Sequence, residues 1–330
     1  MLNPKVKLNT KVFDADVELK PTRDGYGDGL VIAGTEDANV VVLCADLTES
    51  TRSHKFQEKF PERFFEMGVA EQNMATVAAG LGISGKVAFI SSYATFSPGR
   101  NWEQIRTTVA YNDSNVKIAG HHAGLMTGPD GATHQAIEDI ATMRSIANMR
   151  VIVPCDSIQA RQATVAAAKI KGPVYLRFAR EKTPIITTDE TPFEIGKNVL
   201  LWKSKNPTVT IFVAGVLTHG ALVAAKELTD ENIETAVVNV HSIKPLDEKN
   251  IVEMAKKTGA VVTVEEHQVN GGLGGAIAEL LAKKQPTPME MVGMQDIFGE
   301  SGPPKELVEK YNLGPKGIKE AVKQALKRVA

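Results

Sequence analysis

The sequence has little cysteine, no excess of charge of one sign and no long hydrophobic run. Its two cysteines, Cys44 and Cys155, each lie in a hydrophobic, strand-like stretch. This excludes a disulfide framework and a paired-cysteine metal site, and it favours buried free thiols. With 38 basic and 39 acidic residues the net charge is -1, which argues against a general attraction to nucleic acid or to a membrane surface. No apolar run approaches the roughly 18 residues that a membrane span requires.

The amino-terminal segment lacks the features of a secretory signal. Residues 1–10, MLNPKVKLNT, contain neither an apolar core nor a small-residue cleavage site, which predicts a cytoplasmic protein. The 330 residues are enough for two domains that each bury a core. Because the net charge is close to zero, any anionic ligand must be held by local groups.

Apolar, β-branched runs alternate with alanine-rich amphipathic stretches along most of the chain. In the first half the apolar runs are Val40–Cys44, Val87–Ile90 and Val116–Ala119, and the amphipathic stretches between them are Glu71–Leu81 and Trp102–Tyr111. In the second half the apolar runs are Val209–Val213, Thr235–Val240 and Val261–Glu265, and the amphipathic stretches are Gly220–Leu228, Asp247–Lys257 and Gly274–Lys283. This alternation is typical of parallel sheets covered by helices. The predicted fold class is therefore α/β, with two consecutive α/β domains.

The segment Lys182–Lys205 separates the two halves. It contains two prolines and several threonines but no long periodic pattern, which indicates an interdomain linker with a short edge strand. We expect a first domain at residues 15–187 and a second at residues 188–330, whose regular pattern begins near Phe193. Two such domains support many functions, so function must be inferred from particular residues.

The stretch from Phe64 to Gly82, FFEMGVAEQNMATVAAGLG, holds a carboxylate in apolar surroundings. Glu71 lies where an apolar segment passes into an alanine-rich helix. Desolvation there would raise the pKa of Glu71, which suits a group that shares a proton near neutral pH. The pattern fits equally well an acidic residue that stabilises a helix N-terminus through the macrodipole.

The motif GVAEQNMATVAAGLG resembles the glutamate signature of the pyrimidine-binding domain in transketolases and deoxyxylulose-phosphate synthases. The resemblance implies that thiamine diphosphate is the cofactor. It also implies that Glu71 hydrogen-bonds a ring nitrogen of the aminopyrimidine and so promotes loss of the thiazolium proton. The protein would then be a transferase of the pentose phosphate pathway that moves a two-carbon ketol unit between sugar phosphates.

The resemblance extends over essentially the whole chain. It is carried by Thr22-Arg23, ADLTES (Ala45 to Ser50), YATF (Tyr93 to Phe96), HHAGLMTGPDGATHQ (His121 to Gln135), VIVPCD (Val151 to Asp156), VYLRFAR (Val174 to Arg180) and VEEHQVNGGLGGAIAELL (Val264 to Leu281). The last of these is similar to the family's carboxy-terminal domain. Several ordered motifs at matching spacing make a chance match improbable.

The resemblance assigns three further residues to the cofactor. Asp46 matches a position beside the cofactor, and Phe96 matches an aromatic residue that packs on the aminopyrimidine ring. Two other pocket aromatics of the family fall at Gly99 and Trp102. Trp102 can substitute for one of them but Gly99 cannot, so the ring packing is expected to differ in detail.

The resemblance also implies a sugar-binding and catalytic histidine. His134 and Asp130 match residues that hydrogen-bond the hydroxyl groups of the sugar donor. A lone histidine in a turn is otherwise more often structural. Metal binding by His121, His122 and His134 is the alternative, but no cysteine or carboxylate has the spacing to support it, so no metal site is predicted in this chain.

Three residues far apart in the sequence match the family's sugar-phosphate anchors. They are Arg23, His122 and Arg180, with Ser50 as a hydroxyl donor. A planar guanidinium can hold phosphate through two parallel hydrogen bonds. Each residue alone would more often be an ordinary surface residue, so the prediction depends on their joint match.

One part of the family's machinery is missing from the sequence. A complete enzyme binds the cofactor diphosphate through Mg²⁺ at a Gly-Asp-Gly motif that follows a strand and precedes an asparagine. Gly27-Asp28-Gly29 follows a polar run and lacks that asparagine, so we interpret it as an unrelated loop. The glycines at 271–275 lack the dinucleotide spacing and predict a tight turn into a helix.

The resemblance therefore implies a split enzyme. A separate amino-terminal subunit would carry the diphosphate-binding domain and most of the Mg²⁺ ligands. Two copies of each chain would form a heterotetramer, with the cofactor at subunit interfaces.

Three alternatives remain at this stage. A deoxyxylulose-phosphate synthase shares the glutamate motif, but it has an arginine where this chain has Ala123. The beta subunit of a 2-oxoacid dehydrogenase shares the two-domain architecture, but it has a different glutamate motif and no use for sugar-phosphate anchors. A non-catalytic subunit with the same fold is the third, and the joint retention of Glu71, Asp46, His134 and Arg180 argues against it.

Overall fold

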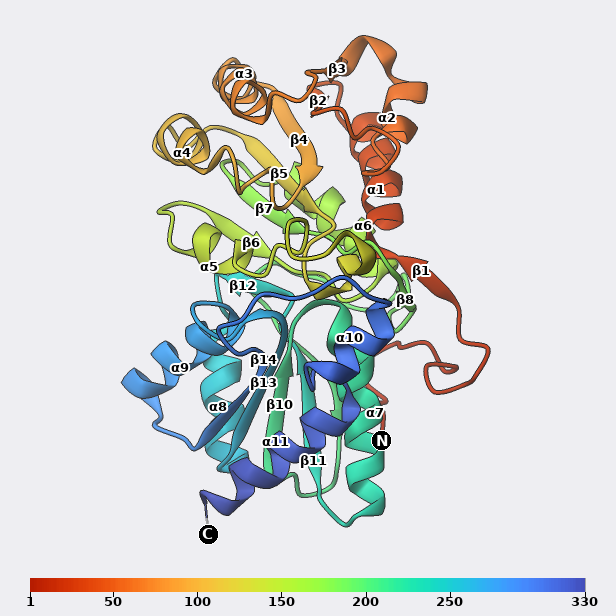
Figure 1. Cartoon of the computed structure of the whole chain (residues 1–330), viewed down its shortest axis with the longest axis vertical. Helices are drawn as coiled ribbons and strands as arrows, with labels where there is room; N and C mark the ends of the chain where they lie inside the picture. Colours follow the sequence, from red (N-terminus) through yellow and green to blue (C-terminus); the bar gives the residue numbers. More distant parts are fainter. Residues whose placement is uncertain (330) are drawn as a thin grey trace.

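The computed structural model describes residues 1–329 and contains two α/β units, each built on a mainly parallel sheet (Figure 1). The predicted α/β fold class is confirmed. The apolar run Val40–Cys44 forms strand β2 and is buried at every position, as expected of a strand with helices on both faces. Both cysteines are buried free thiols, as predicted. Within residues 1–329, no helix combines the length and the apolar character needed to cross a membrane.

The first sheet has seven strands in the order β12-β6-β7-β5-β4-β2-β3. Their bounds are β12 (Ser242–Lys244), β6 (Arg150–Ile152), β7 (Val174–Arg177), β5 (Val116–His121), β4 (Val87–Tyr93), β2 (Val40–Cys44) and β3 (Phe64–Glu66). All neighbours are parallel except β12, which pairs antiparallel with β6. Because β12 belongs to the second half of the chain, the two halves share this sheet. The division at residues 187 and 188 stays a prediction.

Helices cover both faces of the first sheet. One face packs against α1 (Thr22–Glu36), α2 (His54–Lys59) and α6 (Ser157–Ala168), with the short η1 (Pro61–Arg63) at its edge. The other packs against α3 (Glu71–Ile83), α4 (Trp102–Gln104), the π-helix η2 (Ile105–Ala110) and α5 (Asp139–Arg144). The predicted helix at Glu71–Leu81 is thus confirmed, and it begins at Glu71 itself.

The Gly-Asp-Gly stretch at 27–29 lies inside helix α1, so the expectation of a loop is wrong. Glycines of α1, among them Gly25 and Gly29, allow this helix to pack closely against α6. A Cβ at Gly25 would lie 1.9 Å from the carbonyl oxygen of Ser157, and one at Gly29 would lie 2.7 Å from Cβ of Thr164. Tertiary contact therefore outweighs the low helix propensity of glycine here.

Asp28, the acidic residue of that stretch, has partners of its own. Its two carboxylate oxygens accept hydrogen bonds from Lys55 at 2.6 Å and Lys20 at 3.1 Å. These two ammonium groups lower the pKa of Asp28, although its partial burial acts in the opposite direction. Asp28 is therefore part of a local ion-pair cluster.

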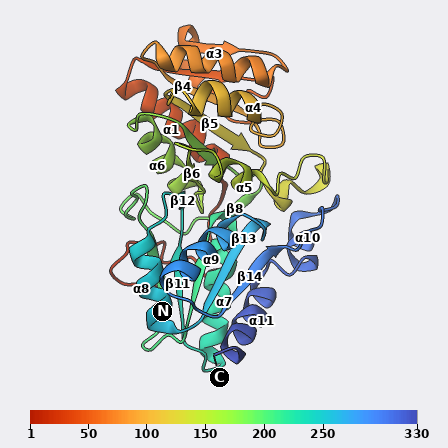
Figure 2. The same cartoon turned by 90° about the vertical axis from the view of Figure 1, so that its left-hand side faces the viewer.

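The second sheet has five strands in the order β14-β13-β10-β11-β9. Their bounds are β14 (Met289–Met294), β13 (Val261–Gln268), β10 (Val209–Val213), β11 (Thr235–Asn239) and β9 (Val199–Lys203). Only β9 is antiparallel to its neighbour. One face is covered by α8 (Glu248–Thr258) and α9 (Leu273–Lys284), the other by α7 (Thr218–Asp230) and α11 (Pro315–Lys327) (Figure 2). The short η4 (Gly215–Leu217) precedes α7.

The predicted linker contains two strands. β8 (Lys182–Pro184) pairs with β1 (Leu19–Pro21) in a separate two-stranded sheet, and β9 forms the edge of the second sheet. The predicted turn before α9 is confirmed, because Gly271 has φ +79° and the helix begins two residues later. The predicted end of the second domain, Ala330, lies outside the described residues.

His241, just before β12, makes acid a destabilising condition for this fold. It is buried, its Nε2 lies 3.0 Å from the carbonyl oxygen of Glu194, and its ring packs on Phe193 with centroids 4.5 Å apart. Burial lowers the pKa of His241 to about 4. Below about pH 6.5 the unfolded chain therefore takes up a proton that the folded chain refuses, and stability falls until the pH nears 4.

We expect His241→Gln to reduce this acid sensitivity. Urea unfolding at pH 7 and at pH 4.5 should give a loss of unfolding free energy about 1 to 2 kcal/mol smaller in the variant than in the wild type. Comparing the difference between pH values, rather than either value alone, removes any constant effect of the lost ring packing. An equal loss in both proteins would show that His241 does not titrate in this way.

Candidate functional site

The predicted site residues gather at the carboxyl-terminal edge of the first sheet. Asp46 follows β2, Phe96 follows β4, His122 follows β5 and Arg180 follows β7. Because neighbouring parallel strands end at the same edge, their following loops meet there. Residues separated by more than a hundred positions in the sequence therefore lie together.

Arg23 and His122 form the buried part of the predicted phosphate anchor. Nη1 of Arg23, on the first turn of α1, lies 3.0 Å from Nε2 of His122 and donates to the carbonyl oxygen of Ser50 at 3.0 Å. Nε of Arg23 is buried and has no partner among the described residues. Burial, and secondarily Arg52, lower the pKa of Arg23. The guanidinium of Arg23 thus has an unused hydrogen-bond donor and is repelled by neighbouring cations. A bound anion would accept a hydrogen bond from that donor and would reduce the repulsion.

His122 is held in an unusual backbone conformation. Its φ is +50°, in the left-handed region that residues other than glycine seldom adopt, and its ring stacks on Tyr93 with centroids 3.9 Å apart. Burial first, and then Arg23 and Arg180, lower the pKa of His122 to about 3. Near pH 7 the ring is therefore neutral, and the positive charge of the anchor comes from the arginines.

Arg180 lies on the more exposed side of the same cluster. Its Nη1 donates to Oδ1 of Asp130 at 3.0 Å and to the carbonyl oxygen of Thr127 at 2.8 Å. Asp130 is the last residue of the short η3 helix (Leu125–Asp130). Two predicted substrate residues, Arg180 and Asp130, are therefore in direct contact as an ion pair. The sequence did not predict this ion pair.

Glu71 is buried at the start of α3 and is engaged by a residue that the sequence analysis missed. Only 2% of Glu71 is exposed, and Arg100 Nη1 donates to its Oε2 at 2.8 Å. Nδ2 of Asn101 donates to the Glu71 carbonyl at 3.0 Å, which fixes the first turn of the helix. Within residues 1–329 only one carboxylate oxygen is engaged, so the other is free for a ligand.

Aromatic rings join the Glu71 side of the site to the phosphate anchor. The guanidinium of Arg100 lies over the ring of Phe96 at 4.7 Å, and Phe96 stacks on Tyr93 with centroids 5.9 Å apart. His134 meets both rings edge-on, at 5.5 Å from Phe96 and 6.2 Å from Tyr93. The predicted residues Glu71, Phe96, His134 and His122 therefore belong to one continuous cluster.

Asp46 lies in a tight, exposed turn after β2. Its φ is +57°, and its backbone N–H donates to Oε1 of Glu66 at 2.7 Å. The same carboxylate accepts the N–H of Gly68 at 3.0 Å and the hydroxyl of Thr48 at 2.7 Å. Glu66 thus ties the turn that presents Asp46 to the segment that leads into Glu71.

Trp102 stands apart from the cluster, and Gly99 has no room for a side chain. A Cβ at Gly99 would lie 2.0 Å from the carbonyl oxygen of Thr95, so the backbone itself excludes the aromatic residue that the family has there. Trp102 donates its indole N–H to the carbonyl oxygen of Thr142 at 3.2 Å. Both residues line a cavity of about 250 Å³ next to α5.

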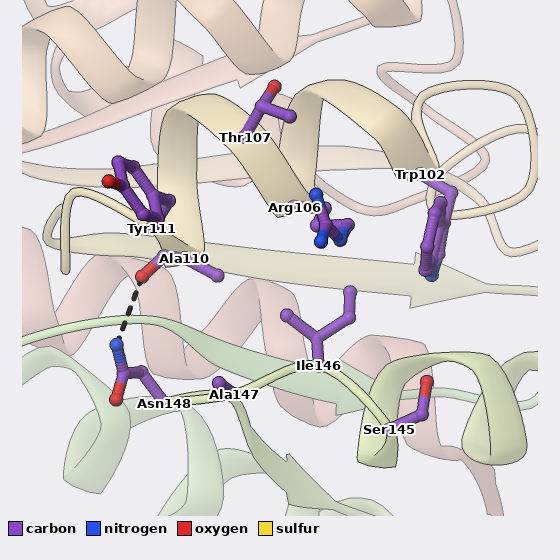
Figure 3. Close-up of a pocket in the computed structure, with 9 residues that line it drawn as sticks. All are labelled: Trp102, Arg106, Thr107, Ala110, Tyr111, Ser145, Ile146, Ala147 and Asn148. Atoms are coloured by element: carbon purple, nitrogen blue, oxygen red, sulfur yellow. Dashed lines mark hydrogen bonds between the residues drawn. The ribbon is translucent and has the colours of Figure 1, made fainter.

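A cavity of about 880 Å³ lies between η2 and the loop that follows α5 (Figure 3). Trp102, Arg106 and Tyr111 line its helical side, and Asn148 on the opposite side donates to the Ala110 carbonyl at 3.2 Å. Of the predicted site residues only Trp102 reaches it. The convergent polar groups of the cluster, rather than this volume, mark the candidate site.

Tyr93, Arg100, Arg52 and Glu66 are the site residues that sequence reasoning missed. Tyr93 lies inside a motif that carries the resemblance, and Glu66 lies two residues before the glutamate motif, so their positions were a usable signal. Arg100 and Arg52 have no such signal, because their roles depend on tertiary contacts. Among residues 1–329, no group of three or more histidine, cysteine, aspartate or glutamate side chains is placed to hold a metal ion.

Comparison with known proteins identifies the family. Residues 20–185 match the transketolase pyrimidine-binding domain, and residues 199–318 match the transketolase C-terminal domain. The chain belongs to the transketolase family. The predicted family and the predicted order of its two domains are confirmed.

Two relatives match this transketolase-family chain along nearly their whole length. A protein of Methanocaldococcus jannaschii described as a transketolase C-terminal section is 44% identical over 94% of this chain and 97% of the relative. A 6-deoxy-6-sulfo-D-fructose transketolase subunit of Clostridium sp. (strain MSTE9) is 39% identical over 96% of this chain and 98% of the relative. The mouse transketolase-like protein 2 is 36% identical, and the match covers 98% of this chain but 52% of that protein.

Solved structures agree with this assignment. A split-gene transketolase, described as an inactive β4 tetramer, is 48% identical with a TM-score of 0.87, covering 93% of this chain and 98% of that chain. The transketolase of Campylobacter jejuni is 20% identical with a TM-score of 0.81, covering 95% of this chain and 50% of that chain. The second comparison shows a shared fold.

Proposed function

We propose that this chain is the carboxy-terminal subunit of a thiamine-diphosphate-dependent transketolase that moves a two-carbon ketol unit between sugar phosphates. The observation that carries the proposal is the continuous cluster from the buried Glu71 carboxylate, through Phe96 and His134, to the Arg23–His122 anchor. It combines a proton-sharing group, an aromatic surface and an anion site in one place. Family membership supports the same reaction class.

The residues on the Glu71 side fit the aminopyrimidine end of the cofactor. When bound, thiamine diphosphate supplies the nucleophile and the electron sink for breaking a carbon–carbon bond. Glu71 would hydrogen-bond a ring nitrogen through its unengaged oxygen, and Phe96 would pack on the ring. Asp46, presented by the Glu66 turn, would border the cofactor. Arg100 would remain on Oε2 and keep the carboxylate oriented.

The residues on the other side fit a hydroxylated, phosphorylated donor. His134 and Asp130 would hydrogen-bond sugar hydroxyl groups, and His134 would also move a proton at the reacting carbon's oxygen. Arg23, His122 and Arg180, with the hydroxyl of Ser50, would hold the phosphate. The unpartnered Nε of Arg23 and the neutral ring of His122 supply hydrogen-bond donors to such a phosphate.

A second chain would complete the enzyme. Asp28, the one acidic residue in a Gly-Asp-Gly stretch, is neutralised by Lys20 and Lys55, which supports a diphosphate and Mg²⁺ site on a separate amino-terminal subunit. Relatives described as a C-terminal section, a subunit and a split-gene enzyme support the same arrangement. We propose a heterotetramer of two copies of each chain.

The packing around Ala123 favours ketol transfer over a synthase that condenses pyruvate with an aldehyde. Ala123 is fully buried against Ala94 and Ala136, so an arginine has no space at this position. Pyruvate also offers no hydroxyl group to Asp130 and His134, and it leaves the buried ring of His122 without a ligand, at roughly 1 to 3 kcal/mol for a buried polar group left unpaired.

The test is reconstitution with the chain that carries the Gly-Asp-Gly domain. The purified chain should be inactive with xylulose 5-phosphate and ribose 5-phosphate. With the partner, thiamine diphosphate and Mg²⁺ it should form sedoheptulose 7-phosphate. Strong activity from this chain alone would rule out a split enzyme.

Two competing donors make the same assay specific. If pyruvate and glyceraldehyde 3-phosphate give mainly deoxyxylulose 5-phosphate, the choice of reaction is wrong. If 6-deoxy-6-sulfofructose is consumed in preference to xylulose 5-phosphate, the anchor serves a sulfonate, as the name of the clostridial relative suggests for that protein. Consumption of xylulose 5-phosphate above both competitors supports the proposal.

A further inference from the structure

The η3 segment, which contributes Asp130 to the site, is held by a buried carboxylate from the second sheet. Oε1 of Glu266, on β13, accepts the backbone N–H of Met126. Gly124, with φ +89°, packs directly on this carboxyl group, and a Cβ there would lie 2.4 Å from Cδ of Glu266. Both the left-handed conformation and this close approach require glycine at 124.

Alternation along β13 sends the two adjacent glutamates to different places. Glu265 accepts the N–H groups of Leu273 at 2.7 Å and Gly274 at 2.8 Å, at the start of α9. Glu266 points the other way, toward η3. Its other oxygen, Oε2, is buried without a partner among residues 1–329. The Glu265 carboxylate caps the start of α9. The Glu266 carboxylate has no such helix to cap, and its one hydrogen bond among the described residues is with the Met126 N–H.

Gln135 makes a second tie between η3 and the second domain. Its buried side-chain NH₂ group lies within hydrogen-bonding distance of three carbonyl oxygens: those of Leu125 at 3.2 Å, Gly128 at 3.3 Å and Glu300 at 3.0 Å. Residues beyond Glu300 lead into α10 (Pro304–Lys310), which lies beside η3 (Figure 2). Gly128 is so close to Pro304 that a Cβ would lie 2.9 Å from its Cγ.

The segment held in this way contacts the predicted phosphate anchor on two sides. The Thr127 carbonyl and the Asp130 carboxylate both accept hydrogen bonds from Arg180. The Thr127 hydroxyl donates to the carbonyl oxygen of His122, the residue with the strained backbone. Any shift of η3 would therefore move Arg180 and would release His122.

We propose that Glu266 and Gln135 are positioning residues through which the carboxy-terminal domain fixes η3 and thereby presets Arg180, His122 and Asp130 for the donor sugar. The anchoring of η3 stands on the contacts of this chain alone. Its effect on the donor sugar rests on the proposed function. Burial raises the pKa of Glu266 to about 7, and Arg177 opposes this shift. Burying a carboxyl group costs free energy that an apolar side chain at the same position would not cost.

The test uses two substitutions at Glu266, one at Gln135 and a matched control. Glu266→Ala removes the acceptor for Met126, whereas Glu266→Gln keeps it. Gln135→Met keeps the side-chain length but removes the donors, and it guards against a failure of Glu266→Ala to fold. Glu300→Ala is the control, because Gln135 uses only the backbone carbonyl and the Glu300 side chain forms an exposed ion pair with Lys310.

Hydrogen exchange of the purified chain reports the anchoring without any assay of activity. Glu266→Ala and Gln135→Met should raise exchange about tenfold at the amides of residues 124–135, consistent with loss of one buried hydrogen bond. Glu266→Gln and Glu300→Ala should match the wild type, and the amides of β5 should be unchanged in all four. If exchange is unchanged in Glu266→Ala and Gln135→Met, or if Glu266→Gln shows the same increase as Glu266→Ala, the proposed anchoring of η3 is wrong.

Kinetics of the assembled enzyme then report the consequence for the substrate. Glu266→Ala and Gln135→Met should raise KM for xylulose 5-phosphate about tenfold, with the concentration of thiamine diphosphate needed for half-saturation unchanged. An unchanged KM despite faster exchange would overturn the link to the donor sugar. If the wild-type assembly has no ketol-transfer activity, the proposed function fails and the exchange results still decide the anchoring.

Discussion

Glu71→Gln should leave the fold intact and lower the turnover of the assembled enzyme by about one to a few powers of ten, on the order of 2 to 4 kcal/mol in the barrier. An amide keeps the shape of the side chain and can still accept a hydrogen bond from Arg100, but it cannot share a proton with a cofactor ring. Turnover should be measured with saturating thiamine diphosphate, so that weaker cofactor binding is not mistaken for slower chemistry.

The structure indicates why this substitution should be tolerated. Asn101 holds the first turn of α3 through the backbone carbonyl of Glu71, so the start of the helix does not depend on the carboxylate. Glu36→Gln is a suitable control. Glu36 is the last residue of α1 and forms an exposed ion pair with Lys169, and such pairs contribute little to stability. Wild-type turnover by Glu71→Gln would exclude the assigned role.

The elements that the sequence predicts well are those in which local pattern and tertiary environment agree. β2 is a continuous apolar run and β10 is apolar except for Thr210; both are buried at every position, as expected of strands with helices on both faces, and both have the predicted bounds. Helix α1 was missed because its glycines have low helix propensity and no apolar period. Its stability comes from close contact with α6, which local sequence does not encode.

Strand β12 is the part of the fold that no local pattern could reveal. It is three residues long and pairs with β6, about ninety positions earlier in the chain, at the edge of the first sheet. Short antiparallel edge strands depend on the arrangement of the two domains. The sequence could therefore predict two units but not their shared sheet.

The candidate site shows the same division. Family resemblance placed Arg23, His122 and Arg180 in one anchor, and the structure brings them together at the sheet edge. Family resemblance could not predict that Arg180 pairs with Asp130, or that Arg100 pairs with Glu71, because each pairing depends on the path of a loop. At Gly99 the departure from the family pattern is explained by a backbone that excludes any side chain.

Arg23→Ala and Arg180→Ala should each lower kcat/KM for xylulose 5-phosphate about ten- to a hundredfold, on the order of 1.5 to 3 kcal/mol, while affecting unphosphorylated xylulose much less. Only the phosphorylated sugar presents a dianion to the guanidinium groups. Arg23 should have the larger effect, because its Nε has no other partner among the described residues, whereas Arg180 is already paired with Asp130.

The comparison between the two sugars separates recognition from structure. Arg180→Ala also frees Asp130 and the Thr127 carbonyl, so a loosened η3 would lower activity with both ketoses alike. Arg180→Lys keeps the charge but loses the planar donor pair, and it should recover only part of the loss. Arg328→Ala, at an exposed ion pair with Glu290, is the control for removing a cation elsewhere. Equal losses on phosphorylated and unphosphorylated xylulose would assign these arginines to structure or to a subunit interface, because a phosphate anchor has no means of acting on a substrate without phosphate.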